Sequence, residues 1–345
     1  MQRRITAPGP LLDEKGRLTE TGYATRLIKA YDRKRVAAPS FRVKEWDYYC
    51  VVSDRYALAL TVADNGYLYL DSASLLDFDA NAQATKSVIL PPLGKRRLPA
   101  SSEAGDIRAA GKGYEIVFEN AGARRRLYGH MDRFPNGKTG ENLLFDVTLS
   151  CPEQDSMVIA TPFSGKPRAF YYNQKINCMP AEGRAVLGDR EYLFAPAHSF
   201  AVLDWGRGVW TYDNTWYWGS ASGLAEGVPF GFNIGYGFGD TSAASENMLF
   251  YAGKAHKLSR VRFEIPMKDG KEDYLSPWRF TSDDGRFEMD FLPLMDRSAE
   301  MDFKLIASIQ HQVFGRFTGT AVLDDGRRIT VRNLTGFAEK VHNKW

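Results

Sequence analysis

Acidic side chains flank a segment of unusual composition between residues 204 and 247, which is rich in glycine and tryptophan. Asp204 stands at its start, whereas Asp240 and Glu246 follow its last glycines. Aromatic surroundings remove water from a carboxyl group and raise its pKa, so that the group can donate a proton near neutral pH. We predict that Asp240, Glu246 or Asp204 acts as a general acid. In the structural alternative, Asp240 caps a turn and Asp204 anchors a strand end, while Glu246 pairs with Arg207 or another arginine.

Four of the seven tryptophans of the chain fall within this segment, namely Trp205, Trp210, Trp216 and Trp218. Trp216 and Trp218 alternate, so on a β-strand both indoles would point to the same side. Together with the other two, they would form a wall that stacks against an extended apolar ligand. A thick aromatic core is the alternative interpretation.

Residues 231–240 carry glycine at most alternate positions. In a strand this pattern leaves one face bare, while the large side chains from Phe232 to Phe238 fill the other. The bare face has room for a bulky side chain of the protein or for a ligand. No helix of a βαβ unit follows, which excludes a dinucleotide fingerprint. The side chains predicted to contact a ligand are Trp205, Arg207, Trp210, Trp216, Trp218, Asn233 and Tyr236.

Antiparallel strands are the elements predicted to position these residues. Apolar and charged residues alternate at 261–265 and 287–291, as expected for strands with one buried face. Dipeptides suited to tight hairpin turns separate such runs, because their glycines adopt positive φ without steric cost. These dipeptides are Asn65-Gly66, Asn136-Gly137, Asp269-Gly270, Asp284-Gly285 and Asp325-Gly326. Successive strands are predicted at 46–52, 56–62, 67–75, 114–118 and 143–149.

The predicted fold class is mostly β, with two antiparallel β-barrels or sandwiches in tandem. We expect residues 1–40 to form an N-terminal arm, residues 41–185 the first barrel domain and residues 186–345 the second. Within the arm, Tyr23 and Tyr31 belong to a four-residue spacing that follows Thr19. This spacing predicts a short helix over residues 19–34.

The composition of the chain excludes several classes of protein. The formal charge of +3 arises from 45 basic and 42 acidic residues mixed along the chain, which argues against nucleic-acid binding. No apolar run is long enough for a membrane span. Three cysteines without paired spacing, and an N-terminus without the pattern of a secretory signal, favour a cytoplasmic protein.

Cofactor motifs are also missing from the sequence. The five histidines are scattered without the spacing of a metal site, and no phosphate-binding loop occurs. The Gly219-Ser220-Ala221-Ser222-Gly223 segment has alanine where a nucleophile elbow requires serine, so this motif of serine hydrolases fails. We therefore expect neither a metal nor another cofactor.

Five segments carry a resemblance to a known family. They are residues 5–13 (ITAPGPLLD), 44–49 (KEWDYY), 204–210 (DWGRGVW), 233–247 (NIGYGFGDTSAASEN) and 336–340 (GFAEK). In these segments the chain resembles the bacterial family known as domain of unknown function 2804. The resemblance covers nearly the whole chain and implies no assigned chemistry.

More distantly, the expected architecture is similar to that of the tandem calycin group. This group includes carotenoid 1,2-hydratases, tocopherol cyclases, a merosterolic acid synthase and certain decalin-forming Diels-Alderases. Gly208-Val209-Trp210 fits the short G-x-W signature of lipocalins. The resemblance implies two lipocalin-like β-barrels and, for the active members, large apolar substrates; no catalytic residue is carried over from them.

These observations predict a cofactor-independent enzyme with an aromatic-lined cavity. It would hydrate, isomerise or cyclise an isoprenoid- or lipid-like substrate by acid catalysis, with aromatic faces stabilising developing positive charge. The first alternative is a carrier that binds a lipid or other apolar metabolite without a titrating acid. The second is a structural or interaction protein in which the aromatic block is packed solid.

Overall fold

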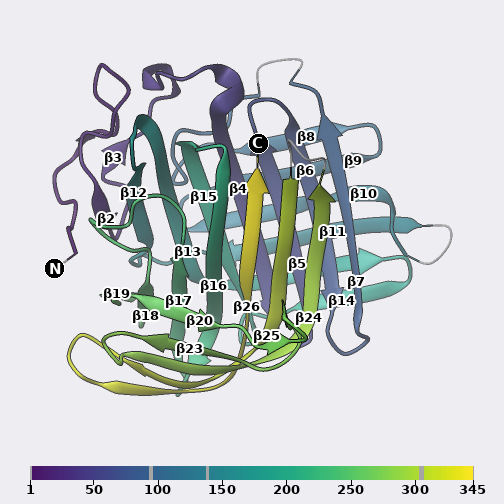
Figure 1. The fold of residues 1–345 in the computed structure, drawn as a ribbon. Helices are drawn as coiled ribbons and strands as arrows, with labels where there is room; N and C mark the ends of the chain where they lie inside the picture. Colours follow the sequence, from purple (N-terminus) through teal and green to yellow (C-terminus); the bar gives the residue numbers. More distant parts are fainter. Residues whose placement is uncertain (1, 93–95, 137–139, 303–306, 345) are drawn as a thin grey trace.

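The computed structural model describes residues 2–92, 96–136, 140–302 and 307–344, and its regular structure is almost entirely β-strand. Two large antiparallel sheets contain 13 and 9 strands (Figure 1). The sheets follow one another along the chain, and each curls around its own hydrophobic core. This arrangement confirms the predicted fold class, a mostly β protein with two antiparallel barrels or sandwiches in tandem.

The first sheet has the main strand order β7, β6, β5, β4, β15, β13, β11, β10, β9, β8. Strands β12 and β14 pair with β13, and β2 of the arm pairs with β12. The bounds are β2 Gly22–Ala24, β4 Val43–Ser53, β5 Tyr56–Asp64, β6 Tyr69–Asp77, β7 Ala82–Leu90, β8 Ile107–Gly111, β9 Tyr114–Asn120, β10 Arg124–Phe134, β11 Glu141–Ser150, β12 Met157–Phe163, β13 Lys166–Leu187, β14 Arg190–Phe194 and β15 Ser199–Val209.

Strand β13 bends the first sheet over on itself. It is 22 residues long, and it pairs with β12 and β15 in its first part and with β11 and β14 in its second. The register with β15 shifts between Ile176 and Met179, where Cys178 has a φ of 58°. An irregularity of this kind bends a strand and increases its twist. The two parts of β13 therefore belong to two layers that cross in Figure 1.

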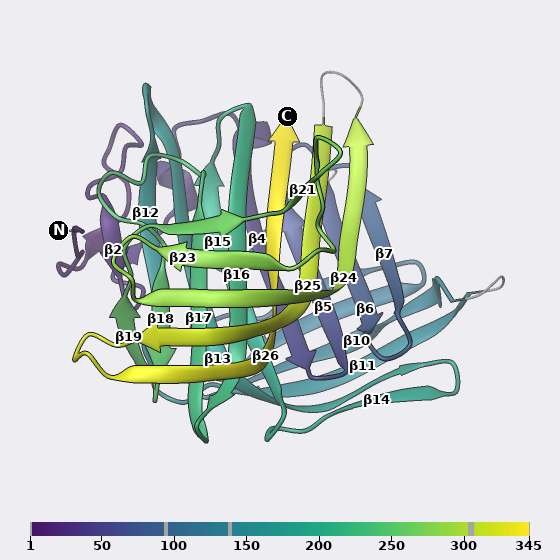
Figure 2. The same ribbon diagram turned by 60° about the horizontal axis from the view of Figure 1, so that its bottom comes forward.

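The second sheet has the order β19, β18, β17, β16, β26, β25, β24, β23, β20. The bounds are β16 Asp213–Ala225, β17 Val228–Tyr236, β18 Met248–Tyr251, β19 Lys254–Lys257, β20 Val261–Glu264, β23 Trp278–Ser282, β24 Phe287–Asp302, β25 Ala307–Val322 and β26 Arg328–Lys344, with a separate hairpin of β21 Met267–Lys268 and β22 Lys271–Glu272. Register shifts at Pro293/Met295 and Phe317/Gly319 interrupt the long pairs. The long strands bend there, so that one half of each faces the first sheet and the other closes the second core (Figure 2).

Buried side chains from both sheets join the two halves of the molecule. One cluster packs Tyr48 and Val202 of the first sheet against Trp218, Phe314 and Phe337 of the second. Another cluster contains Met157, Ile159, Phe163, Tyr171 and Cys178 from the first sheet with Phe238, Met248 and Phe250 from the second. Because each fully buried large apolar side chain contributes about 1.5–3 kcal/mol, this contact holds the sheets together.

The N-terminal arm packs over the body, but the helix predicted over residues 19–34 is wrong. This stretch contains β2, the short strand β3 (Lys29–Ala30), which pairs with β1 (Gly9–Pro10), and the start of a 3-10 helix η1 (Arg33–Arg35). A second 3-10 helix, η2 (Ser40–Arg42), ends the arm. The four-residue spacing arose because separate points of an extended chain contact the body: Tyr23 packs on the inter-sheet cluster, and Tyr31 lies in the first core.

The predicted boundary at residues 185 and 186 does not coincide with the change of sheet. Gly188, with a φ of 59°, turns the chain into β14, which pairs back onto β13. Strand β15 then inserts between β13 and β4 of the first sheet. The chain enters the second sheet only between Val209 and Asp213.

The predicted hairpin turns at Asn65-Gly66, Asp269-Gly270, Asp284-Gly285 and Asp325-Gly326 are confirmed, because each glycine connects two paired strands with positive φ. In the Asp269-Gly270 turn both residues have positive φ, 52° and 77°, as a two-residue type I′ turn requires. The turn predicted at Asn136-Gly137 lies partly outside the described residues.

Candidate active site between the two sheets

Polar side chains gather between the two sheets, within otherwise apolar contact. Lys175 and Asp204 are cross-strand neighbours on β13 and β15 of the first sheet. Asn233 lies on β17 of the second sheet, Glu246 in the loop that follows β17, and Glu339 on β26. We call these five residues the inter-sheet carboxyl cluster.

Lys175 and Asp204 form the ion pair of the cluster. Lys175 Nζ lies 2.9 Å from Asp204 Oδ1, and the lysine side chain is only 3% exposed. The ammonium also lies 3.9 Å from the centroid of the Trp218 ring. Asn173 Nδ2 donates a second hydrogen bond of 2.6 Å to Asp204 Oδ1. Since a buried ammonium group requires a counterion, this arrangement favours Asp204 as an anchored carboxylate.

Glu246 lies over the bare glycine face of β17. Asn233 Nδ2 donates to the backbone carbonyl of Glu246 at 2.9 Å and to its Oε2 at 3.3 Å. Trp218 Nε1 in turn donates to Asn233 Oδ1 at 2.7 Å. Loss of hydration raises the pKa of the Glu246 carboxyl, although Lys175 and Asn233 oppose the rise. A Cβ atom at Gly235 would lie 2.7 Å from Glu246 Oε1, so the glycine makes room for this acid.

Glu339 is the acid whose pKa lies closest to neutrality. Trp216 Nε1 donates to its Oε1 and Gln312 Nε2 donates to its Oε2, each at 3.0 Å. Burial nevertheless raises the pKa of Glu339 to about 7. Near pH 7 its protonated and charged forms are therefore both populated, as acid-base catalysis requires.

Tyr171 on β13 marks where the three acids converge. Burial raises the pKa of the Tyr171 hydroxyl well above its ordinary value, and the negative charges of Glu246, Asp204 and Glu339 add to this effect. All three carboxyl groups therefore act on one buried side chain.

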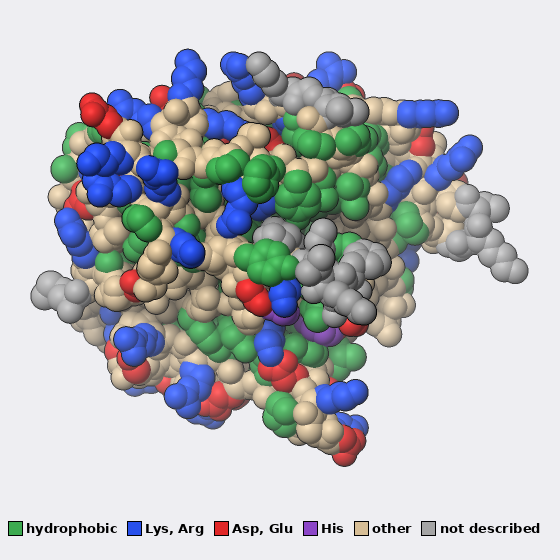
Figure 3. All heavy atoms as spheres, turned by 45° about the horizontal axis from the view of Figure 1, so that its top comes forward, with side chains coloured by type: hydrophobic (Ala, Val, Ile, Leu, Met, Phe, Trp, Pro, Cys, Tyr) green, Lys and Arg blue, Asp and Glu red, His purple; other side chains and the backbone are tan. Residues whose placement is uncertain are grey.

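Aromatic side chains cover one side of the cluster. We call Trp46, Tyr171, Trp210, Trp216 and Phe238 the aromatic wall. The centroid of the Phe238 ring lies 4.8 Å from that of Tyr171, 4.9 Å from that of Trp210 and 5.3 Å from that of Trp216, in edge-to-face contacts. The three tryptophans are partly exposed, so the wall reaches the molecular surface. Figure 3 shows a face of the molecule on which hydrophobic side chains are interspersed with lysine and arginine.

The structure brings several of the predicted ligand contacts together. Trp216 and Trp218 share the face of β16 that meets the first sheet, as the alternation predicted. Trp210 and Asn233 reach the same inter-sheet region.

Other predicted contacts point elsewhere. Trp205 is fully buried in the first core, and Arg207 pairs there with Asp47 at 2.9 Å. The alternative pairing of Glu246 with Arg207 is therefore wrong. Tyr236 stacks on Tyr217 in the second core, with a centroid distance of 4.5 Å.

Phe238 was predicted to share the face of Tyr236, and this is wrong. The strand β17 ends at Tyr236, and Gly237 then adopts a φ of 93°. This turn redirects the chain, so that Phe238 enters the aromatic wall instead of the second core.

Asp240 caps a turn, as the structural alternative had it, because its Oδ1 accepts a hydrogen bond of 3.0 Å from the Ser242 amide. This bond lowers the pKa of Asp240. The expectation of a raised pKa is therefore wrong for this carboxyl. The stretch from Asp240 to Glu246 nevertheless lies at the inter-sheet edge, where the arm holds it: the Ser245 amide donates to Gln2 Oε1 at 2.7 Å.

Sequence reasoning missed Lys175, Glu339 and Trp46. Glu339 stands between Phe337 and Val341 at two-residue spacing on one strand face, and an acid flanked by apolar residues in this way is a usable signal. The sequence contains no comparable signal for Trp46, whose ring packs directly against Gly206 in the fold. A Cβ atom at Gly206 would come within 1.9 Å of the Trp46 ring.

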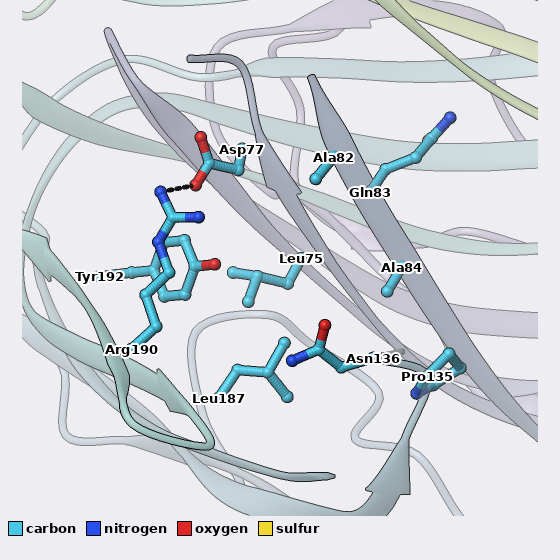
Figure 4. Close-up of a pocket in the computed structure, with 10 residues that line it drawn as sticks. All are labelled: Leu75, Asp77, Ala82, Gln83, Ala84, Pro135, Asn136, Leu187, Arg190 and Tyr192. Atoms are coloured by element: carbon cyan, nitrogen blue, oxygen red, sulfur yellow. Dashed lines mark ion pairs between the residues drawn. The ribbon is translucent and has the colours of Figure 1, made fainter. Parts of the chain in front are cut away.

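A separate pocket of about 440 Å³ opens in the first sheet (Figure 4). Leu75, Ala84 and Leu187 supply apolar lining, and Arg190 pairs with Asp77 at its edge. It contains no residue of the inter-sheet carboxyl cluster.

The described part of the chain contains neither a metal-binding cluster nor a membrane-spanning helix. There, no three or more His, Cys, Asp or Glu side chains are grouped so as to hold a metal ion. No helix among the same residues has the length and apolarity to cross a bilayer.

Solved structures share the fold at low sequence identity. An AttH-like protein from Nitrosomonas europaea has a TM-score of 0.55 and 15% identity, over 92% of this chain and 98% of that one. Kievitone hydratase from Nectria haematococca has a TM-score of 0.56 and 12% identity, over 97% of this chain and 98% of that one. No curated protein matches the sequence. The family model described as "Domain of unknown function (DUF2804)" matches residues 2–345, and the chain belongs to this family.

Proposed function

We propose that this protein catalyses the cofactor-independent hydration, isomerisation or cyclisation of an apolar, isoprenoid- or lipid-like substrate by acid catalysis. The observation that carries the proposal is the pair of acids Glu246 and Glu339, whose pKa values burial raises beside an aromatic wall. A protonated carboxyl group next to apolar and aromatic surfaces is suited to protonate a carbon–carbon double bond.

The acids have distinct roles in this proposal. Glu339 or Glu246, in its protonated form, donates the proton, and Asp204 remains charged as the partner of Lys175. Lys175 occupies the face of Trp218, so that ring is not free to stabilise a cation. Trp210, Trp216 and Phe238 therefore stabilise the positive charge that develops on the substrate.

Isomerisation and cyclisation need no reactant besides the substrate, because the acid that gives a proton later regains one. The O–H bond of the acid breaks as a C–H bond forms, which leaves a carbocation and a carboxylate. In hydration, water adds to the cation and returns a proton to the carboxylate. In the other reactions, the carboxylate removes a different proton from the substrate.

The aromatic wall offers one polar contact for a substrate. Trp210 Nε1 is buried and has no hydrogen-bond partner within the described residues. An unpaired buried donor is unfavourable, and a substrate oxygen at the wall would satisfy it. The name of kievitone hydratase, which shares the fold, agrees with this class of reaction.

The first experiment looks for the ligand itself. Native and denaturing mass spectrometry of the purified protein is expected to reveal a co-purified apolar small molecule. This molecule is then incubated with the protein in D2O, where protonation of a double bond places solvent deuterium on carbon. Consistent absence of such a molecule would contradict both the enzyme and the carrier.

The second experiment assigns the acid. Glu339→Gln and Glu246→Gln are expected to slow deuterium incorporation, by about 10²-fold or more for the residue that donates the proton. Asp240→Asn is the matched control, because its carboxyl belongs to the same loop as Glu246 but has a lowered pKa. Unchanged turnover in both glutamate variants and in Asp204→Asn would reject the acid chemistry. Binding without turnover in the unmodified protein would favour the carrier.

A further inference from the structure

A hollow between the sheets is lined by other residues of strands that contribute to the aromatic wall or to the carboxyl cluster. Strand β4 contributes Trp46 to the aromatic wall and Val52 to the hollow. Strand β26 contributes Glu339 to the carboxyl cluster and Thr335 to the hollow. The volume of the hollow is about 410 Å³. We call it the basic inter-sheet pocket, lined by Val52, Ser53, Asp54, Ala197, His198, Phe200, Ser222, Gly223, Leu224, Arg316, Arg332, Asn333, Leu334 and Thr335.

Part of this lining is apolar and comes from both sheets. Val52 and Phe200 of the first sheet and Leu334 of the second are all less than 9% exposed. Leu224, at the end of β16, is 46% exposed although it is a large apolar side chain. These apolar side chains stand among a larger number of polar and charged ones, so the pocket offers both kinds of contact, in a volume typical of small-molecule sites.

Arg316 is the distinctive polar group of the pocket. It follows Gln312 and Phe314 at two-residue spacing on β25, on the strand face that meets the first sheet. It is partly buried, and its guanidinium group makes no ion pair or hydrogen bond with any other described residue. Arg332, also in the lining, is exposed and equally unpaired among those residues.

The charges around Arg316 do not balance. Asp54 is the one carboxylate of the lining, and its Oδ1 already accepts a hydrogen bond of 3.1 Å from Thr335 Oγ1. Two arginines therefore share the pocket with one carboxylate. A partly buried guanidinium without a partner is unfavourable, and its planar fork of donors matches a carboxylate or phosphate in bidentate fashion.

We propose that the basic inter-sheet pocket binds a small amphipathic anion. Its head group pairs with Arg316, assisted by Arg332, and its hydrocarbon body covers Val52, Phe200 and Leu224. This site is independent of the acid chemistry proposed above, because it shares no residue with the carboxyl cluster or the aromatic wall.

Calorimetric titration with decanoate tests the site, with decanol as the uncharged probe and inorganic phosphate as the probe without a hydrocarbon body. Decanoate is expected to bind at least tenfold more tightly than either. Arg316→Met, which keeps an unbranched side chain but removes the guanidinium group and its charge, is expected to weaken decanoate binding by tenfold or more. Arg316→Lys keeps the charge and is expected to retain part of the affinity.

Three control variants locate the binding. Arg262→Met removes an exposed arginine of β20 that is unpaired among the described residues and lies outside the pocket. Arg190→Met alters the separate pocket of the first sheet, and Glu246→Gln alters the candidate active site. All three are expected to bind decanoate as the unmodified protein does.

Several results would overturn the proposal. One is a decanoate affinity that matches that of decanol or phosphate, and another is the absence of decanoate binding. A third is unchanged affinity in an Arg316→Met protein that retains its unfolding temperature. Loss of binding in Arg190→Met or Glu246→Gln, with Arg316→Met unaffected, would assign the anion to one of the other sites.

Discussion

Glu339 is held by two hydrogen-bond donors, and yet its pKa is raised. Trp216, Lys175 and Arg297 all favour its charged form, whereas burial favours the neutral form. The outcome is a pKa of about 7 against an ordinary value of 4.5, so burial is the larger effect. A difference of this size corresponds to about 3 kcal/mol of folding free energy.

The pH dependence of stability tests this balance at the residue scale. Between pH 4.5 and 7 the folded protein holds a proton on Glu339 that the unfolded chain has lost, so the contribution of Glu339 to stability falls as pH rises. Glu339→Gln lacks this loss. We expect the free energy of unfolding of Glu339→Gln, relative to the unmodified protein, to improve by up to about 3 kcal/mol from pH 4.5 to 8.

Denaturant titrations at several pH values measure this difference. Only its trend with pH is diagnostic, because the new amide also changes the hydrogen bond with Gln312. Asp240→Asn is expected to show no such gain, since the pKa of Asp240 is lowered. A difference between Glu339→Gln and the unmodified protein that stays constant across this range would contradict the raised pKa.

The sequence indicated the segment in which acids and aromatic rings come together. It did not indicate which of the acids in that segment is buried. Glu246 and Asp240 are six positions apart and follow the same glycine-rich strand. Burial raises the pKa of Glu246, whereas a hydrogen bond within a turn lowers the pKa of Asp240. The hydrogen bond of Asp240 is local and was foreseen as an alternative, whereas the burial of Glu246 depends on tertiary contact, which the local pattern could not predict.

At the scale of elements, alternation predicted a shared face correctly within β16, but it failed for Phe238 beyond the end of β17 and did not predict the partner of each face. Trp216 and Trp218 share a face, as expected. Trp205 lies in the first core because its neighbours Asp204 and Gly206 occupy the opposite, inter-sheet face of β15. Both faces of β15 are buried, so polarity gave no sign of which face met the second sheet.

Gly206 shows how closely these elements approach, and its substitution is a sharp test of the packing. In Gly206→Ala the new methyl group would overlap the Trp46 ring. We expect a loss of roughly 1–3 kcal/mol or more in the free energy of unfolding. Because the clash is with one side chain, Trp46→Leu is expected to relieve much of it, and the double variant is expected to lose less than the sum of the single losses.

Urea unfolding of the two single variants and the double variant measures this coupling. Gly315→Ala with Trp46→Leu is the control pair, since a Cβ atom at Gly315 would meet Leu292 and Phe291 of the second sheet instead of Trp46. Additive losses in the Gly206 and Trp46 pair would show that the indole does not occupy the space above the glycine.

At the scale of the whole molecule, two tandem β units could be predicted, but not how the chain passes between them. The predicted boundary fell near the end of β13, just before a real turn, yet β14 and β15 return to the first sheet. Strand β15 forms backbone hydrogen bonds with both β13 and β4, which are far apart in sequence. No local pattern encodes such a long-range pairing.

The inter-sheet contact predicts that both sheets unfold in one transition. Phe314 and Phe317 lie three positions apart on β25 and are fully buried, Phe314 between the sheets and Phe317 in the second core. Replacing either with alanine is expected to reduce the free energy of unfolding by about 3–5 kcal/mol. If the sheets are coupled, Phe317→Ala destabilises the first sheet as well, although no atom of that sheet has changed.

Hydrogen exchange of the β9 and β10 amides reports on the first sheet, whereas both phenylalanines belong to β25 of the second. In the coupled molecule, Phe317→Ala accelerates the exchange of these amides by global unfolding as much as that of β23 and β24. Calorimetry is expected to give equal calorimetric and van't Hoff enthalpies. Acceleration confined to β23 and β24 would mean that the second sheet unfolds alone. The inter-sheet carboxyl cluster would then open without loss of the first sheet, because Glu339 and Asn233 would leave while Lys175 and Asp204 stayed in place.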